Sequence, residues 1–419
     1  MSAAPGQDPV RRGEATAHGE RETEYARQPQ VVRTTPVVIV AAVIGAAGVI
    51  GLVVGGLAGD SEGFFRAYLV GYTFWLGLGL GSLGGAMVQF LTGGYWGLAT
   101  RRIFEAGAST LPLLAVLFVP LLFGLPQLYE WARPELVAAD PILLHKSIYL
   151  NVPLFIARAV VYLAVWAGVA ILLRRLSMAQ DRDGDTLLAA RRLQRLSVVA
   201  ALAVAFTVSF AAIDWLMSLD ADWFSTMYPP MVGTGFLLQT MAFTILVLAA
   251  LASRSSLRDV LTPGVYNDLG SLMLAFLMLW AYMSYFQYRL IWAGNLTDEI
   301  PWYLRRVEGA WLPVALGLAT FGFAIPFWLL LFRPLKRNPR TLSVIAGLIV
   351  LMHVVNVFWL VQPPFSPAGP SVDWLTVAAL IGVGGLWLAV FLWQLGRRPL
   401  LAPNDPRLAQ ALEAARGAA

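Results

Sequence analysis

The stretch from residue 36 to residue 58, PVVIVAAVIGAAGVIGLVVGGLA, contains no charged side chain. A bilayer core is about 30 Å thick, and a helix needs about 20 apolar residues to cross it. Comparable stretches recur at about 36–58, 68–92, 108–129, 149–173, 196–217, 231–253, 269–293, 311–332, 341–362 and 372–395. Because these stretches are long and uninterrupted rather than alternating, they predict an all-α polytopic membrane protein with about ten transmembrane helices, not a β-barrel.

The composition supports a membrane protein and excludes several kinds of cofactor. Hydrophobic residues make up 58% of the chain, charged residues make up 13%, and cysteine is absent. The chain therefore has no disulfides, thiolate nucleophile, cysteine-ligated iron–sulfur cluster or covalent c-type haem. Of the three histidines, His18, His145 and His353, only the last falls within a predicted span. We expect no metal or redox cofactor in this chain.

The distribution of positive charge predicts the topology. The segments on one side of the predicted spans hold 23 of the 30 Lys and Arg residues, and those on the other side hold five. By the positive-inside rule, both termini are predicted to be cytoplasmic. The same bias explains the net charge of +5, so no nucleic-acid partner is expected.

The two ends of the chain are predicted to lie outside the transmembrane domain, which spans residues 36–395. Residues 1–35 hold five Arg and five acidic residues and lack an apolar signal region. They predict a disordered cytoplasmic tail without a cleavable signal peptide. Residues 396–419 are predicted to form a cytoplasmic C-terminal tail.

The predicted outer loops combine aromatic and acidic side chains. The tryptophans predict an interfacial belt, and the acids predict a surface that meets an extracytoplasmic partner. Ordinary anchoring and solvation is the alternative interpretation. The residues concerned are Trp131, Trp223, Trp302, Trp311, Asp220, Asp222, Asp298 and Glu299.

Polar side chains inside the spans mark the candidate functional site, because placing charge in a bilayer costs about 2.5–3.5 kcal/mol on insertion scales. The predicted topology places one set in the outward half of four spans. We interpret this set as a hydrated cavity or proton route that opens outward. In the alternative interpretation the arginines extend to lipid head groups, the aspartate caps a helix, and the histidine bonds a backbone carbonyl. The set is Arg158, Tyr162, Asp214, Tyr282, Tyr285, Arg289, His353 and Asn356.

Three segments resemble one known family. They are KSIYLNVPLFIAR (146–158), IDWLMSLDADWFSTMY (213–228) and YFQYRLIWAGNLTDEIPWY (285–303). Together they resemble the shorter NrfD-like membrane subunit, ActF, of bacterial alternative complex III, a quinol:cytochrome c oxidoreductase. The resemblance covers essentially residues 36–395, and the third segment is its most specific part.

The resemblance implies two four-helix bundles, formed by spans 2–5 and 6–9, with one peripheral helix at each end. It also implies a longer NrfD-like membrane subunit, an iron–sulfur subunit and c-type haem subunits as partners, with quinol as the electron donor. The chain would then be a non-redox subunit that supports the complex and forms a proton-conducting half-channel. Asp214, Arg158, Tyr285, Arg289 and His353 are the pathway residues that the resemblance implies.

Two other functions remain open at this stage. One is a quinol-binding membrane anchor of the polysulfide-reductase type, in which the outer polar residues hold the quinone. The other is an independent secondary transporter, a class in which broken helices occur at matching positions of two halves. Pro112, Pro120 and Pro126 interrupt the third predicted span, and Pro313 and Pro326 interrupt the eighth.

Overall fold

The computed structural model describes residues 34–57, 60–182, 186–252, 257, 260–297, 299–402 and 405. Within these residues, ten helical segments are long and apolar enough to cross a membrane. The prediction of an all-α polytopic membrane protein is therefore confirmed. Most of the predicted N-terminal tail, residues 1–33, lies outside the described residues.

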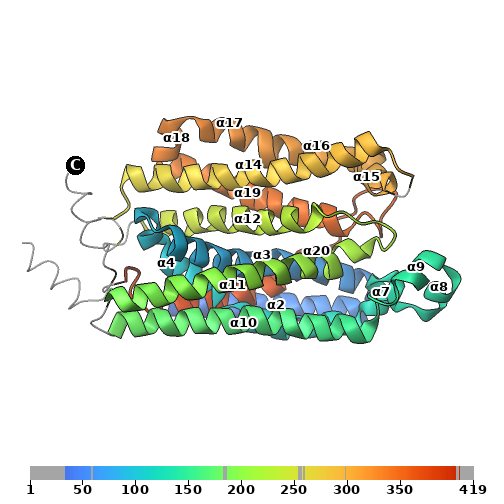
Figure 1. The fold of residues 1–419 in the computed structure, drawn as a ribbon, viewed down its shortest axis with the longest axis horizontal. Helices are drawn as coiled ribbons and strands as arrows, with labels where there is room; N and C mark the ends of the chain where they lie inside the picture. The colour runs from blue at the N-terminus through green and yellow to red at the C-terminus, as the bar shows by residue number, and fades with distance from the viewer. Residues whose placement is uncertain are drawn as a thin grey trace, which may run out of the picture.

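Eight of the ten segments are continuous helices, which lie along a common axis (Figure 1). They are α2 (Thr35–Leu57), α3 (Ser61–Thr92), α10 (Val152–Arg182), α11 (Thr186–Trp215), α12 (Tyr228–Leu251), α14 (Pro263–Gly294), α19 (Pro339–Val361) and α20 (Trp374–Leu395). The other two segments are built from shorter pieces. The third comprises α4 (Tyr95–Ala108), α5 (Leu111–Leu117) and α6 (Val119–Phe123), and the eighth comprises η3 (Gly309–Trp311), α16 (Leu312–Gly317), η4 (Leu318–Ala324) and α17 (Ile325–Leu331).

The two ends of the molecule differ in character (Figure 1). We call the end at which α2 begins and α20 ends the tail face; it also carries α18 (Arg333–Arg337). We call the opposite end the far face. Its short elements are α7 (Leu125–Leu128), η1 (Glu130–Ala132), α8 (Pro134–Ala139), α9 (Pro141–Lys146), η2 (Met217–Leu219) and α15 (Ile300–Val307).

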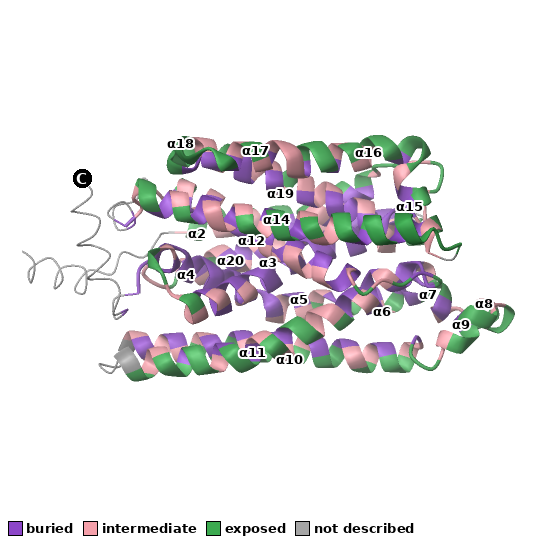
Figure 2. Cartoon of the chain, turned by 45° about the horizontal axis from the view of Figure 1, so that its top comes forward, coloured by how far each residue is buried: buried purple, intermediate pink, exposed green. Residues whose placement is uncertain are grey.

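The contacts between helices define two bundles. The first bundle comprises α3, α4–α6, α10 and α11, and the second comprises α12, α14, α16–α17 and α19. The bundles join where α3 packs against α12, while α2 and α20 pair with each other and attach through α20 to α3. The predicted pair of four-helix bundles with two additional helices is confirmed. Buried residues concentrate along α3 and α12 at the centre (Figure 2).

Glycines allow the closest of these helix contacts. A Cβ atom built on Gly385 of α20 would lie 2.4 Å from the Cα of Gly45 on α2, and one on Gly81 of α3 would lie 2.2 Å from the carbonyl of Phe236 on α12. Small residues let backbones approach in lipid, where packing rather than hydrophobicity drives helix association.

The predicted boundaries of the third span were wrong. Hydropathy predicts this span at 108–129, whereas the helical segment runs from Tyr95 to Phe123. Hydropathy missed its first three turns because Arg101, Arg102 and Glu105 make them look like a loop. The structure buries all three side chains within α4, where the acid and the two arginines neutralise one another.

Candidate functional site

The far-face end of the first bundle holds a fully buried carboxylate. Asp214 lies in the last turn of α11 and faces Arg158 of α10. The Arg158 guanidinium donates through Nε to Oδ2 at 2.8 Å and through Nη2 to Oδ1 at 3.0 Å. The hydroxyl of Tyr162, one turn further along α10, donates to Oδ2 at 2.9 Å. We call these three residues the Asp214 cluster.

The Asp214 cluster is linked to the far-face surface through Arg158 and Tyr149. The Arg158 guanidinium stacks 3.8 Å from the centre of the Tyr149 ring and donates through Nη1 to the Tyr149 carbonyl at 2.9 Å. The Arg158 side chain is 18% exposed, whereas that of Asp214 is 0% exposed. Burial, together with the nearby Asp214 carboxylate, raises the pKa of Tyr149 to about 12, so its hydroxyl stays protonated at neutral pH. The cluster therefore joins a buried carboxylate to a partly exposed guanidinium.

The geometry of this pair has a chemical consequence. Two-point pairing between an arginine and a carboxylate gives strong, directional hydrogen bonds. Ion pairs inside spans nevertheless contribute little net stability, because both charges must be desolvated, and they commonly mark ion or proton pathways. The Asp214 cluster is thus a charge-paired group buried at the end of a helix bundle.

The other five predicted residues do not join the Asp214 cluster. Tyr282, Tyr285 and Asn356 line a cavity in the second bundle. Arg289 is exposed and stacks its guanidinium 5.1 Å from the centre of the Trp292 ring. His353 is buried where α19 meets α12. The predicted set is therefore divided between two bundles rather than gathered around one cavity.

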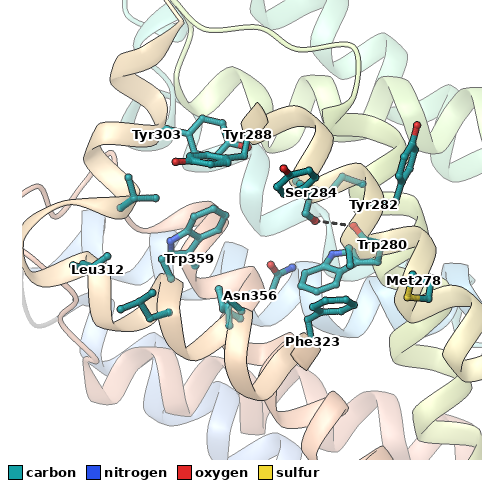
Figure 3. Close-up of a pocket in the computed structure, with 18 residues that line it drawn as sticks. Met278, Trp280, Tyr282, Ser284, Tyr288, Tyr303, Leu312, Phe323, Asn356 and Trp359 are labelled. Atoms are coloured by element: carbon teal, nitrogen blue, oxygen red, sulfur yellow. Dashed lines mark hydrogen bonds between the residues drawn. The ribbon is translucent and has the colours of Figure 1, made fainter. Parts of the chain in front are cut away.

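The cavity in the second bundle has a volume of about 660 Å³ and is bounded by α14, α16, η4 and α19 (Figure 3). Ligand pockets typically measure about 300–1,000 Å³ and combine apolar walls with a few polar groups. Its walls are largely apolar and combine aliphatic side chains with aromatic rings, and polar atoms come from Ser284, Tyr288, Tyr303 and Asn356. The Tyr303 hydroxyl is held by a hydrogen bond from Gln287 Nε2 at 3.1 Å. We call this space the second-bundle cavity.

Between the Asp214 cluster and the tail face, several buried polar atoms make no hydrogen bond to another described residue. They are His353 Nε2, Gln239 Oε1, Thr244 Oγ1, and both Nε2 and Oε1 of Gln89. A small cavity of about 20 Å³, lined by Trp215 and Phe236 among others, lies between α3, α10, α11 and α12. About 10–15 Å³ of such space is enough for one water, and buried polar atoms are normally satisfied by protein or water. His353 belongs to the predicted set, whereas Gln89, Gln239 and Thr244 do not.

A charged network on the tail face was also missed. Glu105 accepts hydrogen bonds from Arg101 Nε at 2.9 Å, Arg102 Nη1 at 2.8 Å and Ser177 Oγ at 2.6 Å. Arg101 also pairs with Asp405 at 3.2 Å, which holds the chain beyond α20 against the bundle. The signal in the sequence was the i, i+3 and i, i+4 spacing of these charges, which a helix places on one face.

The predicted tryptophan belt at the far face was wrong. Trp131, Trp223, Trp302 and Trp311 are all buried. Trp302 stacks on Trp223 with ring centres 4.4 Å apart, and the Arg306 guanidinium lies 3.8 Å from the centre of the Trp302 ring.

Asp220 is likewise buried instead of forming part of an exposed surface. It pairs with Arg305 at 2.7 Å and with Arg306 at 3.0 Å, and these contacts tie the α11–α12 loop to α15. Burial lowers the pKa of Arg306, and the Asp220 carboxylate opposes that shift. Asp220 compensates the charge of the buried Arg306, and the Trp302 ring packs against the guanidinium, so all three side chains lie inside the protein. Asp298 lies outside the described residues.

Comparison with protein-family models and with curated protein sequences found no match. Among the described residues, no group of three or more His, Cys, Asp or Glu side chains is arranged to hold a metal ion.

Proposed function

We propose that this chain is a non-redox membrane subunit of a quinol:electron-acceptor oxidoreductase of the alternative complex III type, in which it supports the assembly and conducts protons. In this proposal the tail face is cytoplasmic and the far face meets the haem-bearing partners. Quinol oxidation and electron transfer take place on partner subunits, because this chain has no cysteine and few histidines. The proposal rests on the resemblance of three segments to the ActF-type subunit and on the Asp214 cluster.

The observation that carries the proton-conducting role is a fully buried aspartate, paired with Arg158 and Tyr162, inside a transmembrane bundle. The Asp214 carboxylate accepts hydrogen bonds from two Arg158 nitrogens and from the Tyr162 hydroxyl. A proton delivered to the carboxylate must therefore rearrange these three hydrogen bonds. Protonation would release Arg158, whose partly exposed side chain can then turn toward the far face. The buried residue would thus exchange protons with the far face through Arg158.

The unpaired polar atoms further inside support the same role. His353, Gln239 and Thr244 supply polar atoms without partners among the described residues. Protons move along chains of side chains and water of this kind in membrane proteins. The half-channel that we propose therefore begins at Asp214 and extends toward the centre of the molecule.

The two other functions considered from the sequence have weaker support. In the anchor hypothesis the outer polar residues hold the quinone, but Asp214, Arg158 and Tyr162 are engaged with one another. The transporter hypothesis needs broken helices at matching positions. The broken spans are instead the second helix of the first bundle and the third helix of the second.

Purification of the full chain from gently solubilised membranes tests the assembly. A C-terminally tagged chain should elute with partners that show a c-type haem absorption band and oxidise a quinol with cytochrome c as acceptor. Native mass spectrometry should assign the haem to the partners. Elution of the chain alone, or with partners that lack haem, would contradict the proposal. Activity of a periplasm-dependent reporter fused to the C-terminus would contradict its orientation.

A further inference from the structure

We propose that a pocket on the tail face, between α4, α10 and α20, binds the phosphate group of an anionic phospholipid. The pocket lies at the end of the first bundle opposite the Asp214 cluster (Figure 1). Its volume is about 10 Å³, the space of one water-sized group, so an oxygen of the phosphate enters while the rest of the head group stays outside. The inference does not depend on the proposed function, because it requires only that the helices cross a membrane.

The first observation is a surplus of positive charge. Arg102, Arg174 and Arg398 line the pocket, and Glu105 is the one acidic residue in the described lining. Glu105 also pairs with Arg101 at 2.9 Å, so its charge is shared. Burial lowers the pKa of Arg398, and the Glu105 carboxylate opposes this shift. The neighbouring Arg102 and Arg174 guanidinium groups lower the pKa of Arg398 further. An anion in the pocket would compensate the charge that Glu105 leaves over.

The second observation is a pair of guanidinium nitrogens without an acceptor. Arg102 Nε and Arg398 Nη2 are buried and make no hydrogen bond to another described residue. Other nitrogens of the same groups are engaged, Arg102 Nη2 by Asp181 at 2.6 and 2.7 Å and Arg398 Nη1 by Glu105 at 3.2 Å. The Arg102 side chain is only 3% exposed. A water would satisfy one donor and leave the positive charge uncompensated, whereas a phosphate oxygen does both.

The third observation favours a lipid over a free phosphate ion. Ile171 and Leu172 occupy the turn of α10 before Arg174, and both are exposed. On α20, the ring of the exposed Trp393 has its centre 4.7 Å from the Arg397 guanidinium carbon. Apolar side chains next to tryptophan and arginine are typical of the level at which acyl chains meet head groups. Basic pockets between transmembrane helices are known to bind anionic head groups at this level.

Native mass spectrometry of the full chain in detergent tests this inference. The probe is phosphatidylglycerol, whose head group is anionic. Phosphatidylcholine carries the same phosphate in a zwitterionic head group, and inorganic phosphate represents the free ion. We expect a retained phosphatidylglycerol adduct, phosphatidylcholine bound about tenfold more weakly, and no displacement of phosphatidylglycerol by an equal concentration of inorganic phosphate.

Two variants remove a guanidinium from the pocket, and a third is their matched control. Arg174→Gln and Arg398→Gln should each weaken phosphatidylglycerol binding about tenfold, the effect of losing one charge-assisted hydrogen bond. Arg175→Gln removes the same charge from the next residue of α10, which is exposed and does not line the pocket, and should leave binding unchanged. Each variant is first shown to be monodisperse by size exclusion and to unfold at the wild-type temperature without lipid.

Three results would overturn the inference. One is the absence of a retained phosphatidylglycerol, or equal retention of phosphatidylcholine. Another is an equal effect of Arg174→Gln and Arg175→Gln, which would mean that anionic lipid is attracted to the basic end of α10 in general. The third is displacement of the lipid by inorganic phosphate, which would assign the pocket to the free ion.

Discussion

At the scale of single residues, the Asp214 cluster places a buried carboxylate against a partly exposed guanidinium. Arg158 on α10 and Asp214 on α11 compensate each other's charge. Because desolvation largely cancels the attraction, the pair as a whole adds little stability, but removing one partner leaves an uncompensated charge. The pair as a whole is therefore weak evidence for a role in stability.

We predict a marked non-additivity between Asp214 and Arg158. Asp214→Leu alone should destabilise the chain by about 3 kcal/mol, at the low end of the range for broken buried pairs because Arg158 is partly exposed. Arg158→Met together with Asp214→Leu should recover most of this loss. Thermal unfolding in detergent measures both effects. Additive losses in the double variant would show that the two side chains are not coupled.

At the scale of elements, the pairing of α2 with α20 depends on glycine. Residues on α2 face outward over most of its length, so its attachment relies on the narrow strip where Gly45 and Gly385 meet. A methyl group at this strip would collide with backbone, which cannot move aside as a flexible side chain can.

Gly385→Ala is predicted to lower the unfolding temperature, because overpacking of this kind costs about 1–3 kcal/mol. Gly168 on α10 supplies the control, since a Cβ there meets nothing within 4 Å. Gly168→Ala should be neutral or slightly stabilising, as alanine favours helix by about 1 kcal/mol over glycine. Equal unfolding temperatures for the two variants would mean that α2 and α20 do not hold each other in this register.

At the scale of the whole molecule, the sequence predicts which segments cross the membrane better than it predicts which helices contact one another. Hydropathy gave ten spans, and helical spacing placed Arg158 and Tyr162 on one face of α10. Hydropathy does not say which helices touch, so the residues of α14 and α19 were assigned to the same cavity as Asp214. Their separation follows from the packing of α3 against α12 between the two bundles.

The wrong predictions for charged and tryptophan side chains have a similar physical cause. Arg101 and Glu105 look like loop residues because a sequence does not show that Ser177 and Asp405 will meet them. The far-face tryptophans look like a membrane belt for the same reason. In each place, partners distant in sequence make burial of a polar or amphipathic side chain possible.

The most direct test of the central claim is the number of protons moved per electron by the assembled complex in sealed vesicles. Asp214→Asn and Tyr162→Phe remove, respectively, the acid and its hydroxyl donor. Tyr266→Phe is the control, because Tyr266 lies in the first turn of α14, in the second bundle and away from the Asp214 cluster. We expect the first two variants to assemble, to retain haem, and to move fewer protons per electron, while Tyr266→Phe matches wild type. Assembled Asp214→Asn and Tyr162→Phe complexes with the wild-type ratio and turnover would contradict proton conduction through the Asp214 cluster.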